Sequence, residues 1–158
     1  MTNISAHISY KEATKSTDAI RLGLPNVPDA EELECMRTVA EKVFEPLRAH
    51  FKVPIRITSF FRSEEVNNAI PGSSPTSDHV KGRAIDMDMD GTGWSVTNAD
   101  LFHHIRQNLP FDQLIWEHGD KHQPDWVHVS YREGANRGHV LRAYRVGKAT
   151  KYTQWMPS

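Results

Sequence analysis

The feature that most constrains the fold is a pair of short polar stretches that lie far apart in the chain. His79 and Asp86 fall in the first stretch, and His128 ends the second, which begins at Asp125. Two imidazoles and one carboxylate form a ligand set that suits zinc and leaves a fourth tetrahedral position open for water. If the three side chains bind one ion, the segments that carry them must lie side by side. An open position is typical of catalytic zinc, and Asp125 would accept a proton from that water.

Both stretches run into segments that alternate as β-strands do. In residues 83–90 the apolar side chains point to one face and the acidic ones to the other, namely Ile85, Met87 and Met89 against Asp86, Asp88 and Asp90. In residues 126–131 the same period places Trp126, His128 and Ser130 on one face and Val127, Val129 and Tyr131 on the other. We therefore expect Val127 in the core and the ligands on the opposite face.

Hydrophobic periodicity predicts the other main elements, which are strands over 55–60 and 113–117 and helices over 30–50 and 97–109. Asp29 and Thr97 stand where helix N-caps are expected, and Ser9 and Ser63 would cap two shorter helices. Pro46 is expected to kink the first long helix or to begin its last turn. The order of elements predicts an α+β fold, a small, mainly antiparallel sheet with helices packed on one face and the zinc site on the sheet.

Composition limits the size and the class of the protein. With 158 residues, 38% hydrophobic and 25% charged, we expect one domain over 1–158, with a packing arm over 1–28 and a site-bearing core over 55–131. A net charge of -1 argues against nucleic-acid partners. Cys35 is alone, which excludes an internal disulfide. Because we find neither a signal-peptide pattern nor a long apolar run, we expect synthesis in the cytoplasm and no membrane insertion. We also expect a monomer.

The acidic run offers a rival interpretation as a calcium loop. Residues 86–91 match the first half of an EF-hand, including Gly91 at the sixth position. The twelfth position needs a bidentate Glu but is Thr97, so calcium is set aside. Asp90 is expected at a solvated loop end. Asp88 has two open roles, as a solvated residue or as an acceptor that orients a ligand histidine.

Three segments together resemble the zinc D-alanyl-D-alanine carboxypeptidase family, which includes VanX-type dipeptidases and phage L-alanyl-D-glutamate endolysins. The motif Ser-x-His-x-x-Gly-x-Ala-x-Asp stands in residues 77–86, a Ser-x-aromatic-Arg-Ser segment stands in residues 59–63 with Asn67 after it, and an acid-x-x-His segment stands in residues 125–128. The resemblance covers the chain from about Ile55 to Tyr131. In much of the family the acid before the last histidine is Glu. Here it is Asp125, and the endolysin-like branch has Asp at this place as well.

The resemblance implies a hedgehog/D-Ala-D-Ala peptidase-like fold and one zinc ion per chain. The ion would be held by His79, Asp86 and His128. The resemblance also assigns the proton acceptor to Asp125. It makes Arg62 the donor that stabilises the developing oxyanion and a contact for the substrate.

Alternatives remain for several of these residues. Arg62 would otherwise pair with Glu64 or Glu65 at the surface, and Ser77 either binds substrate or stabilises its own loop. Glu117 competes with Asp125 as the base, because it ends a strand expected beside residues 126–131; its alternative is a salt bridge or a hydrogen bond at the end of the sheet. Surface or packing roles are expected for His7, His50, His103, His104 and His139, whereas His118 and His122 lie where they could line the cleft.

These observations predict a zinc-dependent peptidoglycan peptidase that hydrolyses a stem or cross-bridge bond involving D-amino acids, as a carboxypeptidase or as an endolysin-type endopeptidase. Its partner would be a peptidoglycan peptide, and it would reach the cell wall by phage lysis, in a virion or by another non-classical route. Two alternatives stay open. One is a non-catalytic binding module that keeps zinc for structure, and the other is a zinc dipeptidase or amidase acting on soluble substrates.

Overall fold

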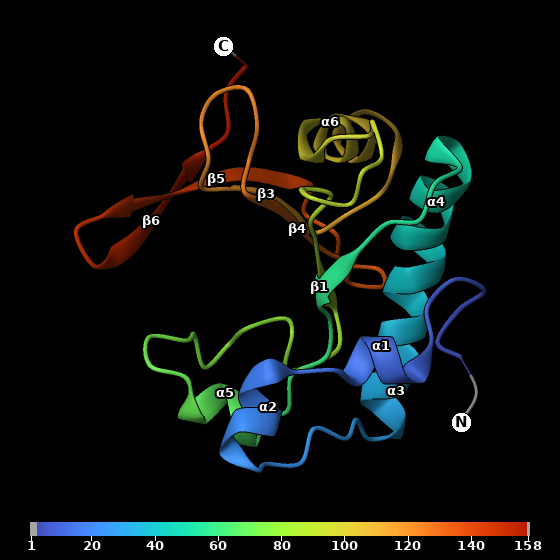
Figure 1. Cartoon of the computed structure of the whole chain (residues 1–158), viewed down its shortest axis with the longest axis vertical. Helices are drawn as coiled ribbons and strands as arrows, with labels where there is room; N and C mark the ends of the chain where they lie inside the picture. The colour runs from blue at the N-terminus through green and yellow to red at the C-terminus, as the bar shows by residue number, and fades with distance from the viewer. Residues whose placement is uncertain (1–2, 158) are drawn as a thin grey trace.

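The centre of the protein is a six-stranded sheet, seen in a computed structural model that describes residues 3–157 (Figure 1). The strands lie in the order β1-β2-β4-β3-β5-β6. Their bounds are β1 Ile57–Ser59, β2 Ala84–Met87, β3 Gln113–Glu117, β4 Trp126–Ser130, β5 His139–Val146 and β6 Ala149–Gln154. In the described part of the chain β3 and β5 pair in parallel, whereas the other neighbours are antiparallel. The sheet is therefore mixed, which corrects the expectation of a mainly antiparallel one.

The helices agree with the sequence periodicity, except that no helix was predicted over residues 17–22. Their bounds are α1 Tyr10–Thr14, α2 Thr17–Leu22, α3 Ala30–Val39, η1 Ala40–Phe44, α4 Glu45–Phe51, α5 Glu64–Ala69 and α6 Asn98–Asn108. Asp29 and Thr97 each form a complete capping box. The irregularity expected at Pro46 lies just before it, as the π-helical turn η1. Pro46 itself stands in the first turn of α4, where its lack of an N–H interrupts the helical hydrogen bonds. None of the helices within residues 3–157 is both long and apolar enough to cross a bilayer.

The hydrophobic core lies between the sheet and the helices α3, α4 and α6 (Figure 1). Period-two alternation supplies the side of the core that belongs to the sheet, with Ile85, Met87, Leu114, Trp116, Val127 and Val129 at most 1% exposed. Burial of each such side chain stabilises the fold by roughly 1.5–3 kcal/mol. The prediction that Val127 is a core residue is confirmed. The neighbouring Asp86 and His128 consequently point to the other face of the sheet.

The sequence analysis placed no element after Tyr131, but β5 and β6 form a hairpin there that projects from the sheet (Figure 1). A two-residue loop at Gly147 joins them, and its φ of 61° is the left-handed conformation that such turns require. The segment before β5 is fixed by Asp112, which is fully buried and accepts from Arg137 Nη2 at 2.8 Å. His139 N also donates to the Asp112 carbonyl at 2.9 Å, so β5 begins beside the start of β3 and runs parallel to it.

Candidate metal centre and active-site cleft

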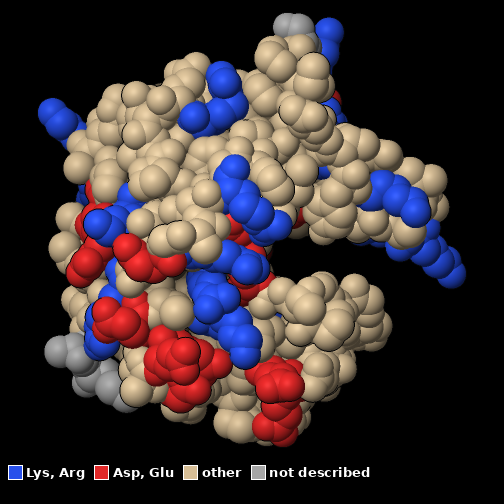
Figure 2. All heavy atoms as spheres, turned by 180° about the vertical axis from the view of Figure 1, so that it is seen from behind, with Lys and Arg blue, Asp and Glu red and all other residues tan. Residues whose placement is uncertain are grey.

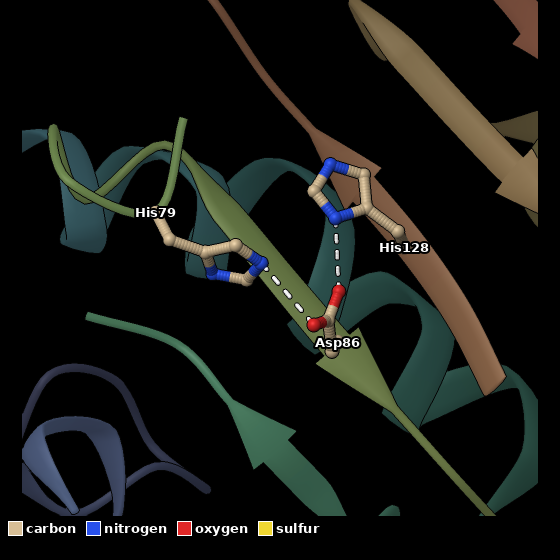
Figure 3. A group of neighbouring side chains, drawn as sticks. All are labelled: His79, Asp86 and His128. Atoms are coloured by element: carbon tan, nitrogen blue, oxygen red, sulfur yellow. Dashed lines mark hydrogen bonds and ion pairs between the residues drawn. The ribbon is translucent and has the colours of Figure 1, made fainter. Parts of the chain in front are cut away.

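Three side chains from separate segments converge on one point of the sheet (Figure 3). Asp86 on β2 and His128 on β4 are direct partners in the antiparallel register. Asp86 Oδ1 lies 2.9 Å from His128 Nδ1, and Asp86 Oδ2 lies 3.2 Å from His79 Nε2. One candidate ligand atom from each residue lies within 4.8 Å of the others. The three predicted ligands are thus brought together in the described structure, in a group that could hold one metal ion.

A tight turn before β2 positions His79. Its Nδ1 lies 2.8 Å from the carbonyl oxygen of Phe60, and donation to that carbonyl leaves Nε2 as the nitrogen that faces Asp86. Gly82 allows the turn to pack on α3, because its φ is 73° and an added Cβ would lie 2.7 Å from the carbonyl oxygen of Glu32. His79 is only 4% exposed, so its ring has little freedom to turn away.

The electrostatics of the group fit a cation. Burial by itself would raise the pKa of Asp86, but the imidazoles of His79 and His128 outweigh it and hold that pKa well below its usual range. Burial likewise opposes a charged His79, yet the Asp86 carboxylate raises the pKa of that imidazole. An ionised carboxylate flanked by two imidazole nitrogens, with one tautomer fixed by a backbone carbonyl, is a donor set of the kind zinc takes.

The three residues lie in a cleft of about 570 Å³ on the face of the sheet away from α6. Figure 2 shows a deep notch between a projecting arm and the body below it, and Figure 1 shows β5 and β6 facing the segment around α5. One wall is rich in hydroxyls, from Ser73, Ser74, Thr76 and Ser77. The other is largely apolar, from Ile115, Trp126, Leu141 and Tyr152. The cleft thus offers hydrogen-bonding groups on one side and packing surface on the other.

Arg62 and Ser77, both predicted at the site, line this cleft. Arg62 Nη1 donates to Asn67 Oδ1 at 3.0 Å, a contact within the helix-capping segment, and not to Glu64 or Glu65. Ser77 Oγ accepts from the backbone N–H of His79 at 3.3 Å. Ser77 therefore stabilises the turn and lines the cleft at the same time.

Comparison with known families was consistent with this geometry. Residues 6–130 match the model of the family described as Peptidase M15. The chain belongs to the Peptidase M15 family. This is the family of zinc D-Ala-D-Ala carboxypeptidases, VanX-type enzymes and endolysins, so the protein is a zinc metallopeptidase. No curated protein matches the chain. The match ends at the close of β4, so β5 and β6 lie outside it.

The two candidate bases of this M15 peptidase lie in different places. Glu117 ends β3, lines the cleft and is 7% exposed. Burial raises the pKa of Glu117 to about 7, with His128 lowering it and Asp86 raising it by their charges. Asp125 is exposed and is not among the cleft-lining residues, and its charge contributes to raising the pKa of Asp90. The structure does not bring Asp125 to the metal group, because it stands three residues before His128 and strand alternation turns it to the other face.

Among the remaining polar residues, Asp88 takes neither of its two expected roles, because it is half-buried and bonded within the fold, whereas the histidines make surface or packing contacts. Asp88 accepts from Asn98 Nδ2 at 2.9 Å and lies 3.3 Å from Arg56, so it orients no ligand histidine. His118 packs on the cleft residue Trp126, with ring centroids 5.2 Å apart, whereas His122 is exposed. The others make surface or packing contacts, His7 with Glu45, His50 with His104, and His103 with Trp155.

Proposed function

We propose that this M15 peptidase is an endolysin-type endopeptidase that cleaves a peptidoglycan peptide bond involving a D-amino acid. One observation carries the proposal: a single cleft contains the metal-ligand group, Arg62 and Glu117. Hydrolysis of a peptide bond needs an activated water, a proton acceptor and a donor for the developing oxyanion. The cleft supplies side chains suited to each requirement.

The roles follow from chemistry and position. His79, Asp86 and His128 would hold the zinc, which when bound lowers the pKa of water to about 7 and polarises the scissile carbonyl. Glu117, rather than the Asp125 predicted from the sequence, accepts the proton from the attacking water and returns it to the leaving amine. A carboxylate that borders the cleft and is shielded from solvent is suited to this double task.

The charge of the cleft favours an endopeptidase over a carboxypeptidase. Arg62 is the one lysine or arginine among the cleft-lining residues of the described chain. If its guanidinium stabilises the oxyanion, no second cation remains to pair with the free carboxylate at the end of a carboxypeptidase substrate. A substrate whose chain continues past the scissile bond needs no such partner.

The walls of the cleft fit a stem or cross-bridge peptide. The hydroxyls of residues 73–77 can bond the N–H and C=O groups of an extended peptide, and the apolar wall suits the small methyl side chains of alanine residues. Leu141 and Tyr152 come from the hairpin outside the family match, so residues beyond the matched segment would take part in substrate selection. To meet such a substrate the protein must reach the cell wall.

The test is digestion of purified peptidoglycans with the zinc-loaded protein, followed by mass spectrometry of the released muropeptides. We expect fragments with one new amino terminus per cleavage and an internal bond cut, and none with His128→Ala. Release of only a terminal D-alanine would replace the endopeptidase by a carboxypeptidase. Cleavage of soluble dipeptides but of no peptidoglycan would refute the wall substrate, and zinc-loaded protein inert on all of them would favour a binding module.

A further inference from the structure

A second hollow lies on the other face of the sheet, under α6. It measures about 600 Å³, similar to the cleft of about 570 Å³. Strand alternation separates the two, because Ile115 and Leu141 line the cleft whereas the next residues along their strands, Trp116 and Arg142, line the hollow. Figure 1 shows α6 on the opposite side of β3 and β5 from α5, with the segment after β6, up to residue 157, on the α6 side.

The hollow is lined by cations without matching anions. Arg106 on α6, Lys121 in the loop after β3 and Arg142 on β5 all line it, and the lining includes no aspartate or glutamate. Within residues 3–157, none of the three lies within 4.0 Å of a carboxylate oxygen. The Asp120 carboxylate acts on Arg142 by its charge but lies beyond 4.0 Å, and it accepts from the backbone N–H groups of His122 and Gln123. Three cations from separate segments against that one carboxylate give the hollow a positive potential.

The hollow also contains side-chain nitrogens without hydrogen-bond partners. In the described part of the chain, four solvent-shielded side-chain nitrogens have no hydrogen-bond partner, and three of them line the hollow, namely His103 Nδ1, Arg106 Nε and Arg142 Nε. The fourth, on Arg132, lies 3.2 Å from Asp112 Oδ2 and so has an ionic partner. Shielded polar atoms are normally paired, and a bound water or ion is one of the explanations for those that are not.

Aromatic rings hold two of these side chains in place. Arg106 Cζ lies 5.0 Å from the ring centroid of Trp155, within the range of a cation–π contact. The His103 ring lies 5.8 Å from that of Trp155 and 6.0 Å from that of Trp116. A guanidinium stacked on a ring loses less freedom when it binds an anion, so the donors are arranged before any ligand arrives.

We propose that this hollow binds a phosphate group, either on a free phosphate or in a phosphodiester-linked polymer. A phosphate group offers more acceptor oxygens than a carboxylate, and free phosphate also carries more charge; arginine binds either form with two parallel hydrogen bonds. Donors from α6, β5 and the loop after β3 approach from different directions, which suits a tetrahedral anion better than a planar one. Occupancy would anchor the enzyme through a face distinct from the one where hydrolysis takes place.

The test is isothermal titration calorimetry of the zinc-loaded protein with inorganic phosphate, with a short glycerol-phosphate oligomer and with acetate at the same ionic strength. We expect saturable binding of a phosphate probe, at least tenfold weaker in Arg106→Gln and in Arg142→Gln. Arg145→Gln is the matched control, since Arg145 is exposed on the same strand and lines neither cavity. Tighter binding of the oligomer would identify the polymer as the source, and tighter binding of inorganic phosphate the free anion.

Two controls make the result decisive. Phosphate can also bind zinc, so the titration is repeated after EDTA treatment, and binding should persist. Circular dichroism and the melting temperature show whether each variant is folded. Binding that vanishes with the metal, that is equal for acetate, or that is unchanged in both folded variants would overturn the proposal.

Discussion

Replacing Glu117 by glutamine should abolish hydrolysis while leaving zinc bound. The change keeps the shape of the side chain and removes the proton acceptor. Loss of a general base typically costs about a hundred- to ten-thousandfold in rate. Because Glu117 is 7% exposed at the end of β3, solvent offers few groups to replace it, and we expect the upper part of that range in kcat.

Asp125→Asn is the matched control from the same corner of the sheet. Its backbone N–H donates to the Glu117 carbonyl at 2.8 Å, and its carbonyl accepts from Asn98 Nδ2 at 3.1 Å. Both contacts belong to the backbone and survive the substitution. Substitution of an exposed side chain usually changes folding stability by less than about 0.5 kcal/mol. Because Asp125 also lies outside the cleft lining, we expect the variant to hydrolyse substrate at a rate within about twofold of the wild type.

The assay measures zinc content, kcat and KM for both variants on the substrate identified by mass spectrometry. Equal zinc content is required before the rates are compared, because metal loss would mimic loss of the base. If Asp125→Asn is inactive with zinc bound and Glu117→Gln hydrolyses normally, the base is Asp125 and the assignment made from the cleft geometry is refuted. If neither variant slows the reaction, both assignments are wrong.

Further predictions concern the metal, the turn, the substrate wall and pH. His128→Ala should lower zinc content from about one equivalent to near zero, and full retention would contradict the ligand assignment. Gly91→Ala should lower the free energy of urea unfolding by roughly 1–2 kcal/mol, and Gly82→Ala should lower it by about 1–3 kcal/mol more. Both glycines have a positive φ, but only at Gly82 would an added Cβ meet α3. Equal losses of stability would refute this. Tyr152→Ala should raise KM about tenfold, a loss of about 1.4 kcal/mol of binding, with kcat nearly unchanged; an unchanged KM would exclude the hairpin from substrate binding. In metal-free protein burial raises the pKa of Glu117 to about 7 from 4.5, so ionising this carboxyl group opposes folding. The wild type should therefore lose about 3 kcal/mol of folding stability between pH 4.5 and 8, and Glu117→Gln should keep it. Parallel curves of stability against pH for the two proteins would count against a buried Glu117.

The metal group could be predicted from the sequence because it depends on local rules. Period-two alternation in residues 83–90 and 126–131 assigned Asp86 and His128 to the face opposite the core, and their shared chemistry required the strands to pair. The structure adds the register, in which the two residues are direct partners. His79 needed only a turn of the right length before β2, which the segment through Gly82 supplies.

The hairpin of β5 and β6 could not be placed in the same way. Its two-residue loop at Gly147 is a sequence signal for the turn itself. Its position beside β3 depends on Asp112 and Arg137, which are far apart in sequence and ordinary in type. No periodicity predicts that such a pair will direct a strand to one edge rather than another, so the parallel pairing and the apolar wall of the cleft appear only in three dimensions.

Strand parity explains why the sequence motif and the geometry select different bases. In the β3–β4 pair Ile115 is the direct partner of His128, and Glu117 that of Trp126. Direct partners share a face, and so do residues two apart along one strand, so Glu117 must lie on the side of the metal ligands. Asp125, an odd number of residues from His128, would reach that face only through a bulge or bend, and Pro124 before it is buried without turning it inward. The acid nearest in sequence to a ligand is therefore the less favourable choice, and the acid on the neighbouring strand is the better one.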